Sequence, residues 1–224
     1  MVANRDRYTD RRDAGRRLVP LLSGYGGGDG VVVLALARGG LGVGVEVAKG
    51  LGCPMDPLFV RKIGVPGHEE LAAGAVVDGP TPETVTNPEV CRLARVSEAY
   101  ITAEAERQLA EIARRRRLYM GEHPPLAVAG RTAIVVDDGI ATGASMRAAL
   151  RAVRRAGPAV LVMAVPVGAP DTLEALAGSV DAVVCPLRPD DFGAVGVYYA
   201  DFHQVEDAEV IALLDEANRA VGRW

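Results

Sequence analysis

Aromatic residues and surplus positive charge are both scarce in this sequence. Aromatic side chains make up 4% of the 224 residues, although 49% of the residues are hydrophobic. The core must therefore be built mainly from Val, Leu, Ala and Ile, and this apolar content excludes a chain that is disordered throughout. The formal net charge of −4 lacks the basic excess that binding to a nucleic-acid backbone requires. We therefore expect no nucleic acid as the main partner.

Cysteines are few, and the sequence has no long apolar run. Cys53, Cys91 and Cys185 are odd in number and widely spaced, without a Cys-x-x-Cys pair, so we expect buried thiols in a reducing compartment. The longest apolar runs, residues 31–37 and 159–167, are too short to span a bilayer. The N-terminal residues show no secretory signal. These absences predict a cytoplasmic protein with no membrane partner.

Short apolar runs alternate with amphipathic segments along the chain. The expected strands are residues 31–37, 57–62, 74–77, 130–138, 159–167 and 181–187. The expected helices are residues 10–22, 45–52, 97–119, 145–156, 171–178 and 207–220. Residues 63–74 and 78–89 are expected to be irregular, since glycine, proline and polar residues dominate them. The alternation predicts an α/β fold around a mostly parallel sheet, with ligands bound beyond the carboxyl ends of the strands.

Residues 135–145, VVDDGIATGAS, combine an acid pair with a loop of small residues. The loop offers close backbone approach, the hydroxyls of Thr142 and Ser145, and the N-terminus of a following helix, which together suit a phosphate. It is not a Walker loop, because the Gly-Lys-Ser/Thr element is missing. Asp137 and Asp138 repel a phosphate but accept hydrogen bonds from hydroxyls or face a divalent cation. The alternative is a simple Asp-Gly turn with no ligand. The full pattern favours a ligand such as ribose 5-phosphate.

This stretch resembles the phosphoribosyl-pyrophosphate (PRPP) signature of the type I phosphoribosyltransferases. The resemblance implies that Asp137 and Asp138 hold the ribose 2- and 3-hydroxyls. It also implies that the loop after them holds the 5-phosphate, through Gly139, Ile140, Ala141, Thr142, Gly143, Ala144 and Ser145. The 6-oxopurine members carry an aspartate at the position of Ala141, so the loop is most similar to that of the adenine-type members.

Two further stretches resemble elements of the same family, in the family's order along the chain. ALARGG (residues 35–40) looks like the pyrophosphate loop, which implies contacts to the leaving group from Ala37, Arg38, Gly39 and Gly40. FVRKIGVPG (residues 59–67) is similar to the stretch that opens the mobile loop, with Arg61 and Lys62. A nicotinamide-dependent module is the alternative for ARGGLGVG, but the Gly-x-Gly-x-x-Gly spacing fails and Asp56 precedes its strand.

The resemblance also implies a domain organisation. We expect one phosphoribosyltransferase domain over residues 1–224, with a five-stranded central sheet flanked by helices. Its parts are a core at about 28–77 and 126–187, a helical insertion at about 78–125, and a hood from about 1–27 and 188–224. The tail FGAVGVYYADF is similar to the hood segment of some members. It supplies the candidates for binding the acceptor, Phe192, Tyr198 and Tyr199.

The implied reaction displaces pyrophosphate from ribose C1 by a nitrogen nucleophile, such as that of a nucleobase. Cations would meet the leaving group, and we expect Mg²⁺ to be carried by PRPP near the acid pair, without a dedicated protein site. Residues 63–73 would form a lid, with Glu70 or Glu69 as general base and His68 behind them. The catalytic candidates are Arg38, Lys62, Glu70, Asp137 and Asp138.

Two alternatives stay open at this point. A non-catalytic PRPP-binding regulator would keep the acid pair and phosphate loop, although Arg61, Lys62 and the glycine-flanked lid favour an enzyme, which we expect to be a homodimer. Residues 114–117, four consecutive arginines, lie near the end of the expected long helix. They are either a solvated helix end that suits the helix dipole or a contact with a phosphate or a partner subunit.

Overall fold

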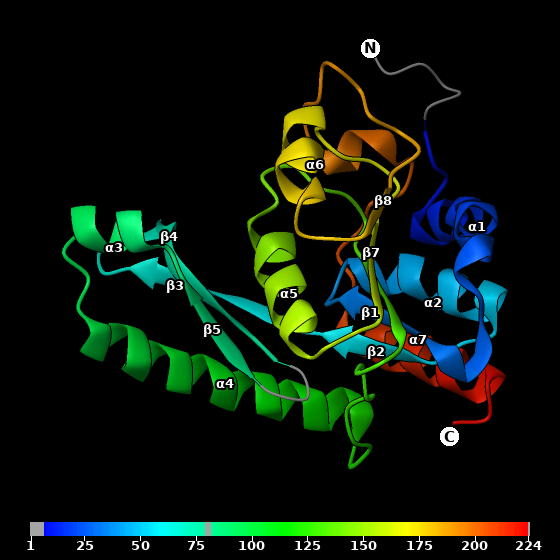
Figure 1. The fold of residues 1–224 in the computed structure, drawn as a ribbon, viewed down its shortest axis with the longest axis horizontal. Helices are drawn as coiled ribbons and strands as arrows, with labels where there is room; N and C mark the ends of the chain where they lie inside the picture. Colours follow the sequence, from blue (N-terminus) through cyan, green and yellow to red (C-terminus); the bar gives the residue numbers. More distant parts are fainter. Residues whose placement is uncertain (1–6, 79–81, 224) are drawn as a thin grey trace.

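The computed structural model describes residues 7–78 and 82–223 and contains a five-stranded parallel sheet. The strands lie in the order β2-β1-β6-β7-β8 (Figure 1). Their bounds are β1 Val31–Leu36, β2 Met55–Leu58, β6 Thr132–Val136, β7 Val160–Ala164 and β8 Ala182–Val184. All four neighbouring pairs are parallel. The expected α/β fold with a parallel five-stranded sheet is therefore confirmed.

Helices cover both faces of this sheet. The helices are α1 Arg11–Leu22, α2 Gly40–Leu51, α5 Ala144–Arg155, α6 Pro170–Ala177 and α7 Asp207–Ala220. Val31, Val33 and Ala35 of β1 pack in the cluster that contains α1, α2 and α7, whereas the alternate residues face α5 and α6. Every β1 residue is buried, because a parallel strand covered on both faces must be apolar on both.

A second, antiparallel sheet and two helices form an arm that projects from this core (Figure 1). The arm contains β3 Val60–Val65, β4 His68–Val77, β5 Glu83–Thr86, α3 Pro88–Leu93 and α4 Glu98–Met120. The long helix begins at its N-cap Ser97, whose hydroxyl accepts a hydrogen bond from Tyr100 N at 3.2 Å, and it ends before Gly121. The helix predicted over 97–119 is therefore present, and the predicted strand 74–77 forms the end of β4, whereas the rest of β4 and β5 were not predicted.

Three sequence predictions differ from the structure in this arm. Residues 57–62 form no single strand: β2 and β3 belong to different sheets and are separated at Phe59, whose N–H donates to Asp78 at 2.7 Å. The expected lid loop 63–74 is a β-hairpin that turns at Gly67, where φ is +75°. The proline-rich stretch 78–89 contains β5. The hairpin is stabilised by Ile63, Ala73 and Val76, which are buried in the core cluster.

The N-terminal segment and the C-terminal tail, both assigned to the hood, lie side by side. Tyr8 N donates to Tyr198 O and Ala200 N donates to Tyr8 O, each at 2.8 Å. This pairing brings α1 and residues 195–203 to the carboxyl edge of the central sheet. The cysteines are free thiols, but Cys91 is only half-buried, in contrast to the expected burial of all three. Among the described residues, no helix is long and apolar enough to cross a membrane.

Candidate functional site

The acid pair and the expected pyrophosphate loop meet at one edge of the central sheet. Asp137 and Asp138 follow β6, residues 37–40 follow β1, and these two strands are parallel neighbours. A Cβ on Gly39 would overlap the carboxylate of Asp138, and one on Gly40 would lie 2.8 Å from Val136 O. Glycine at both positions therefore lets the two loops touch. The Ala37–Arg38 peptide bond between β1 and α2 is cis.

Burial raises the pKa of both carboxylates in the acid pair. The pKa of Asp137 lies well above its ordinary value, first because the group is desolvated and then because Asp138 repels a second negative charge. Burial also raises the pKa of Asp138, against the opposing effect of Arg11. Asp138 N donates to Asp137 Oδ1 at 2.9 Å. The pair thus titrates as a unit that binds protons readily unless a cation or hydroxyl donors are present.

Arg11 at the start of α1 is part of this site, and the sequence analysis missed it. Its Nε donates to Asp138 Oδ2 at 2.8 Å, its Nη1 donates to His203 O at 2.8 Å, and its guanidinium lies 4.0 Å from the centroid of the Phe202 ring. The sequence feature that relates to this position is Gly42, where a Cβ would lie 2.9 Å from Arg11 Cβ, so that glycine lets α1 and α2 approach each other. That signal is readable only once the two helices are placed together.

The loop after the acid pair presents its small residues to solvent. Ala141, Thr142, Ala144 and Ser145 are exposed, and α5 begins directly after Gly143, whose φ is +71°, without a side-chain cap. The first N–H groups of α5 therefore lack helical partners and suit an anion.

Two contacts anchor this loop to the neighbouring strand and helix. Thr172 Oγ1 donates to Ala141 O at 2.7 Å. Ile140 is buried, and its N–H donates to Val167 O at 3.0 Å. Ile140 was included among the phosphate-binding residues, but its contacts make it an anchor of the loop instead.

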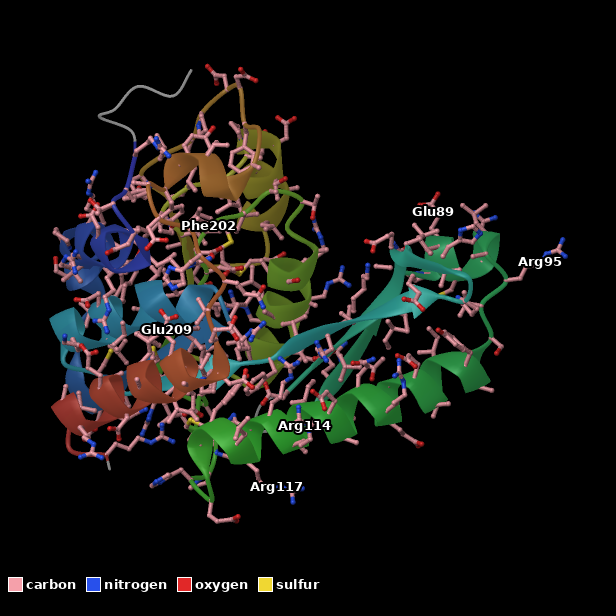
Figure 2. The ribbon with its side chains drawn as sticks, turned by 180° about the vertical axis from the view of Figure 1, so that it is seen from behind. Glu89, Arg95, Arg114, Arg117, Phe202 and Glu209 are labelled. Atoms are coloured by element: carbon pink, nitrogen blue, oxygen red, sulfur yellow. The ribbon has the colours of Figure 1, made fainter. Side chains whose placement is uncertain are left out.

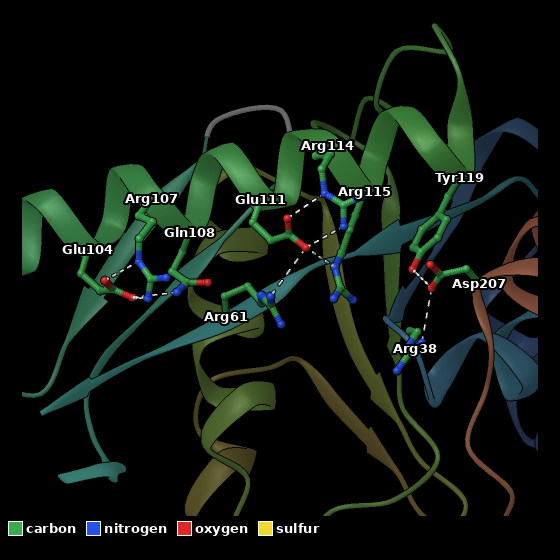
Figure 3. A network of polar contacts seen from close by, with 10 residues as sticks. All are labelled: Arg38, Arg61, Glu104, Arg107, Gln108, Glu111, Arg114, Arg115, Tyr119 and Asp207. Carbon is green, nitrogen blue, oxygen red and sulfur yellow. Dashed lines mark hydrogen bonds and ion pairs between the residues drawn. The ribbon is translucent and has the colours of Figure 1, made fainter. Parts of the chain in front are cut away.

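Arg38 lies where the pyrophosphate loop approaches α4 and α7. Its Nη1 is 3.3 Å from Asp207 Oδ1, the same oxygen that accepts the hydroxyl of Tyr119 at 2.7 Å (Figure 3). The acid pair, the solvent-facing loop and Arg38 thus combine carboxylates, free backbone N–H groups and a guanidinium at one edge of the sheet.

Comparison with known proteins identifies the family of this chain. A family model described as Phosphoribosyl transferase domain matches residues 5–203. The chain belongs to the phosphoribosyl transferase domain family. The crystal structure of TT1426 from Thermus thermophilus is 44% identical with a TM-score of 0.79, and the match covers 93% of this chain and 97% of that chain. The expected family is therefore confirmed.

The curated relatives of this phosphoribosyl transferase domain are longer than the chain. Two proteins of Mycobacterium tuberculosis, from strains CDC 1551 and H37Rv, are each 44% identical over 212 residues, and both carry a provisional name as a phosphoribosyl transferase. The matches cover 95% of this chain and 47% of each relative. The chain thus spans about half the length of the curated relatives it matches.

In this phosphoribosyl transferase domain, Arg61 and Lys62 point to opposite faces of β3, as successive strand residues do. Arg61 faces α4, with its Nη2 3.9 Å from Glu111 Oε1. Lys62 lines a groove of about 400 Å³ together with Thr142 and Ser145 of the predicted phosphate loop. Lys62 therefore faces the loop predicted to bind phosphate, whereas Arg61 faces α4.

The acceptor and base candidates are placed less favourably. Tyr198 and Tyr199 are each 1% exposed, so neither ring offers a face to a ligand. Tyr199 OH instead donates to Asp138 O at 2.6 Å and supports the acid pair from behind. Phe192 stacks on Tyr198 with ring centroids 5.6 Å apart. Glu70 is fully exposed on the hairpin, where its Oε2 lies 3.4 Å from Lys62 Nζ.

Proposed function

We propose that this protein transfers the 5-phosphoribosyl group of PRPP to a nitrogenous acceptor, with release of pyrophosphate. The observation that carries the proposal is the contact between the acid pair and the Gly39–Gly40 backbone, one loop away from the free N-terminus of α5. PRPP carries vicinal hydroxyls between a phosphate and a pyrophosphate, and these groups match, in order, the acid pair, the N-terminus of α5 and the Gly39–Gly40 backbone. The family membership supports the same reaction class.

Each group would have a distinct part in this reaction. Asp137 and Asp138 would accept hydrogen bonds from the ribose hydroxyls, and the backbone of residues 141–145 would bind the 5-phosphate. Lys62 and Arg38 would meet the charge that develops on the leaving pyrophosphate. Glu70 is engaged with Lys62 on the exposed hairpin. Proton removal from the acceptor is therefore left unassigned.

The acid pair also fits Mg²⁺ carried by the substrate. In the described residues, no group of three or more His, Cys, Asp or Glu side chains could hold a metal ion alone. Two carboxylates supply the hard oxygen ligands that Mg²⁺ prefers, and Arg11 occupies only one oxygen of Asp138. A divalent cation would also oppose the burial and the repulsion from Asp138 that together raise the pKa of Asp137. When bound, Mg²⁺ would neutralise charge on the pyrophosphate.

A nucleobase is the acceptor class that we propose. Ala141, where the resemblance places an aspartate in 6-oxopurine enzymes, is exposed on the loop and favours an adenine-type acceptor. A non-catalytic PRPP-binding regulator is the second candidate, since it requires only the acid pair and the phosphate loop. Lys62 beside Thr142 and Ser145 favours the enzyme.

Pyrophosphate release tests the proposal directly. The protein is mixed with PRPP and Mg²⁺ and assayed across a panel of nucleobases and amines. We expect release with at least one nucleobase. PRPP binding without release for every acceptor would favour the regulator, and a protein that does not bind PRPP would refute both candidates.

Asp137→Asn with Asp138→Asn should weaken PRPP binding at least about tenfold, because the amides lose the charge that attracts Mg²⁺ and that strengthens hydrogen bonds from the ribose hydroxyls. Calorimetric titration with PRPP measures this change. Asp190→Asn with Asp191→Asn is the matched control, because it neutralises two adjacent carboxylates outside the site. Equal affinities in the two double variants would contradict the role of the acid pair.

A further inference from the structure

We propose that the pocket where the arm joins the core binds a small neutral lactam, a ring that carries a carbonyl oxygen beside an N–H group. The pocket lies between strands β1 and β2, the C-terminal half of α5 and the C-terminal end of α4, which meet at the base of the arm (Figure 1). Its volume is about 230 Å³, and an apolar cavity of about 150 Å³ already admits benzene. The inference does not depend on the proposed transferase reaction.

The walls of the pocket are largely apolar. Leu34 and Leu58 come from neighbouring strands of the central sheet, and Ala152 and Val153 come from α5. All four side chains are buried. A sheet wall and a helix wall of this kind favour the body of an organic ring over a hydrated ion.

Arg116 of α4 forms the polar part of the pocket together with two buried carboxylates. It is the third of the four consecutive arginines 114–117, but its side chain is only 16% exposed, so it does not belong to a solvated helix end. Its Nε donates to Asp78 Oδ2 at 3.1 Å, and its Nη2 lies 3.6 Å from Asp56 Oδ2. Its Nη1 is buried without a hydrogen-bond partner among the described residues. Since a buried donor without an acceptor is costly, a carbonyl oxygen in the pocket would supply the partner that Nη1 lacks.

The Asp78 carboxylate can accept a further hydrogen bond. Its two oxygens accept one each, from Phe59 N and from Arg116 Nε, whereas each carboxylate oxygen has room for about two. Because Asp78 and Arg116 are bonded to each other, the spare acceptor and the unpartnered Nη1 lie close together. A lactam offers the complementary groups, since its carbonyl accepts and its adjacent N–H donates.

The charges around the pocket are balanced. The charged side chains form three ion pairs: Asp56 with Arg223, Asp78 with Arg116, and Glu83 with Arg155. An ion that entered the pocket would lose its hydration without finding an opposite charge that is still unpaired. The balance therefore favours a neutral ligand over a carboxylate or an amine.

The pocket is separate from the predicted PRPP site. None of the residues that line it belongs to the loops 37–40 and 137–145. The predicted phosphate loop leads into α5 at Ala144, whereas the pocket begins at Ala152, so about 12 Å of helix separates them. A ligand here would instead contact the core through β1 and β2 and the arm through Asp78 and Arg116.

Calorimetric titration with 2-pyridone, a neutral six-membered lactam, tests the site. We expect saturable binding to the wild type with a Kd at or below about 1 mM. Ala152→Leu should weaken it at least about tenfold, because the larger side chain occupies part of the pocket. Ala103→Leu, the same exchange at an exposed position of α4, is the matched control and should stay within about twofold of the wild type. Equal affinities in the two variants, or no saturable binding to the wild type, would overturn the proposal.

A second pair of variants tests the polar contacts. Arg116→Lys keeps a positive charge beside Asp78 but loses the planar fork and its Nη1 donor, so the affinity for 2-pyridone should fall at least about fivefold. Arg117→Lys is the control, because that side chain is exposed on the same helix (Figure 2). Circular dichroism should be unchanged in both. Retention of full affinity in Arg116→Lys would overturn the proposal.

Three other compounds define the ligand. N-methyl-2-pyridone lacks the N–H, and benzoate is an anion of similar size, so each should bind at least about fivefold more weakly than 2-pyridone. Uracil carries the lactam group on a nucleobase, and its competition with 2-pyridone distinguishes a nucleobase from a smaller lactam as the source of the group. Either result with uracil supports the site, whereas benzoate that binds as tightly as 2-pyridone would overturn it.

One further variant separates this pocket from the proposed reaction. Asp137→Asn with Asp138→Asn should bind 2-pyridone as the wild type does, because the acid pair does not line the pocket. Loss of 2-pyridone binding in that variant would place the lactam in the predicted transferase site and overturn a separate pocket. If PRPP does not bind at all, the 2-pyridone titrations still discriminate Ala152→Leu from its control.

Discussion

Arg11 and Asp138 are 127 positions apart in the chain, yet they form an ion pair in which both side chains are nearly buried, at 11% and 13% exposure. The acid pair itself was predicted from the sequence because its neighbours in the chain supply its context. Arg11 could not be predicted in the same way, since its function depends on a tertiary contact. At the scale of single residues, the motif predicts the acid pair but not the arginine that pairs with one of its members.

Replacing Arg11 by glutamine should therefore destabilise the protein. The variant leaves a largely desolvated carboxylate without its cation, and we expect the free energy of unfolding to fall by roughly 2–4 kcal/mol. Urea unfolding at pH 7 measures this change. Arg16→Gln on the same helix is the control, because Arg16 is exposed and lies 3.9 Å from its nearest carboxylate oxygen. Equal stabilities of the two variants would show that the ion pair contributes nothing.

The elements of the core were predictable, whereas in the arm only α4 and the end of β4 were. A parallel strand buried on both faces is a continuous apolar run, so β1, β6 and β7 are visible in the sequence. Strand β4 begins with His68, Glu69 and Glu70, which are exposed. Its first half therefore lacks the apolar pattern of a strand, and only its packing against α4 shows that it is one. The loops that follow β1 and β6 were predicted as site elements for the same local reason. The opposite orientations of Arg61 and Lys62 were not, because the strand around them was misplaced.

The contact between the loops that follow β1 and β6 gives a prediction at the scale of structural elements. Gly39→Ala should reduce PRPP affinity at least about tenfold, because the added Cβ displaces the Asp138 carboxylate. The backbone at Gly39 has a φ of −57°, which alanine adopts without strain, so an effect would not arise from backbone strain. Gly24→Ala is the control, since a Cβ there meets nothing within 4 Å. Calorimetry that finds the same PRPP affinity in both variants would contradict the assignment.

At the scale of the whole molecule, Asp78 connects the arm to the core. Its carboxylate accepts a hydrogen bond from Phe59 N at 2.7 Å, between β2 and β3, and another from Arg116 of α4 at 3.1 Å. Burial raises the pKa of Asp78 to about 6, although Arg116 opposes the shift. The folded protein therefore holds this proton more tightly than the unfolded chain does.

The stability contributed by Asp78 should consequently fall as the pH rises. The contribution is fully present below the unfolded pKa near 3.8 and is lost as the pH passes through about 6. Relative to Asp78→Asn, the wild-type free energy of unfolding should drop by roughly 2 kcal/mol between about pH 4.5 and 7.5. Urea titrations at several pH values measure the difference. Asp190→Asn, at a carboxylate outside the arm and the site, should give a difference that stays flat, and a flat curve for Asp78→Asn would refute the prediction.

Tyr199, whose hydroxyl donates to the carbonyl of Asp138, follows that residue by 61 positions in the chain. Arg11, which donates to the Asp138 carboxylate, precedes it. During synthesis, the acid pair leaves the ribosome well before the tyrosine that steadies it. The central sheet can begin to assemble earlier, but the pair reaches its final setting only after the tail has been translated and has docked beside the first helix. Ligand competence thus waits for the segment around Tyr199, which is synthesised well after the acid pair.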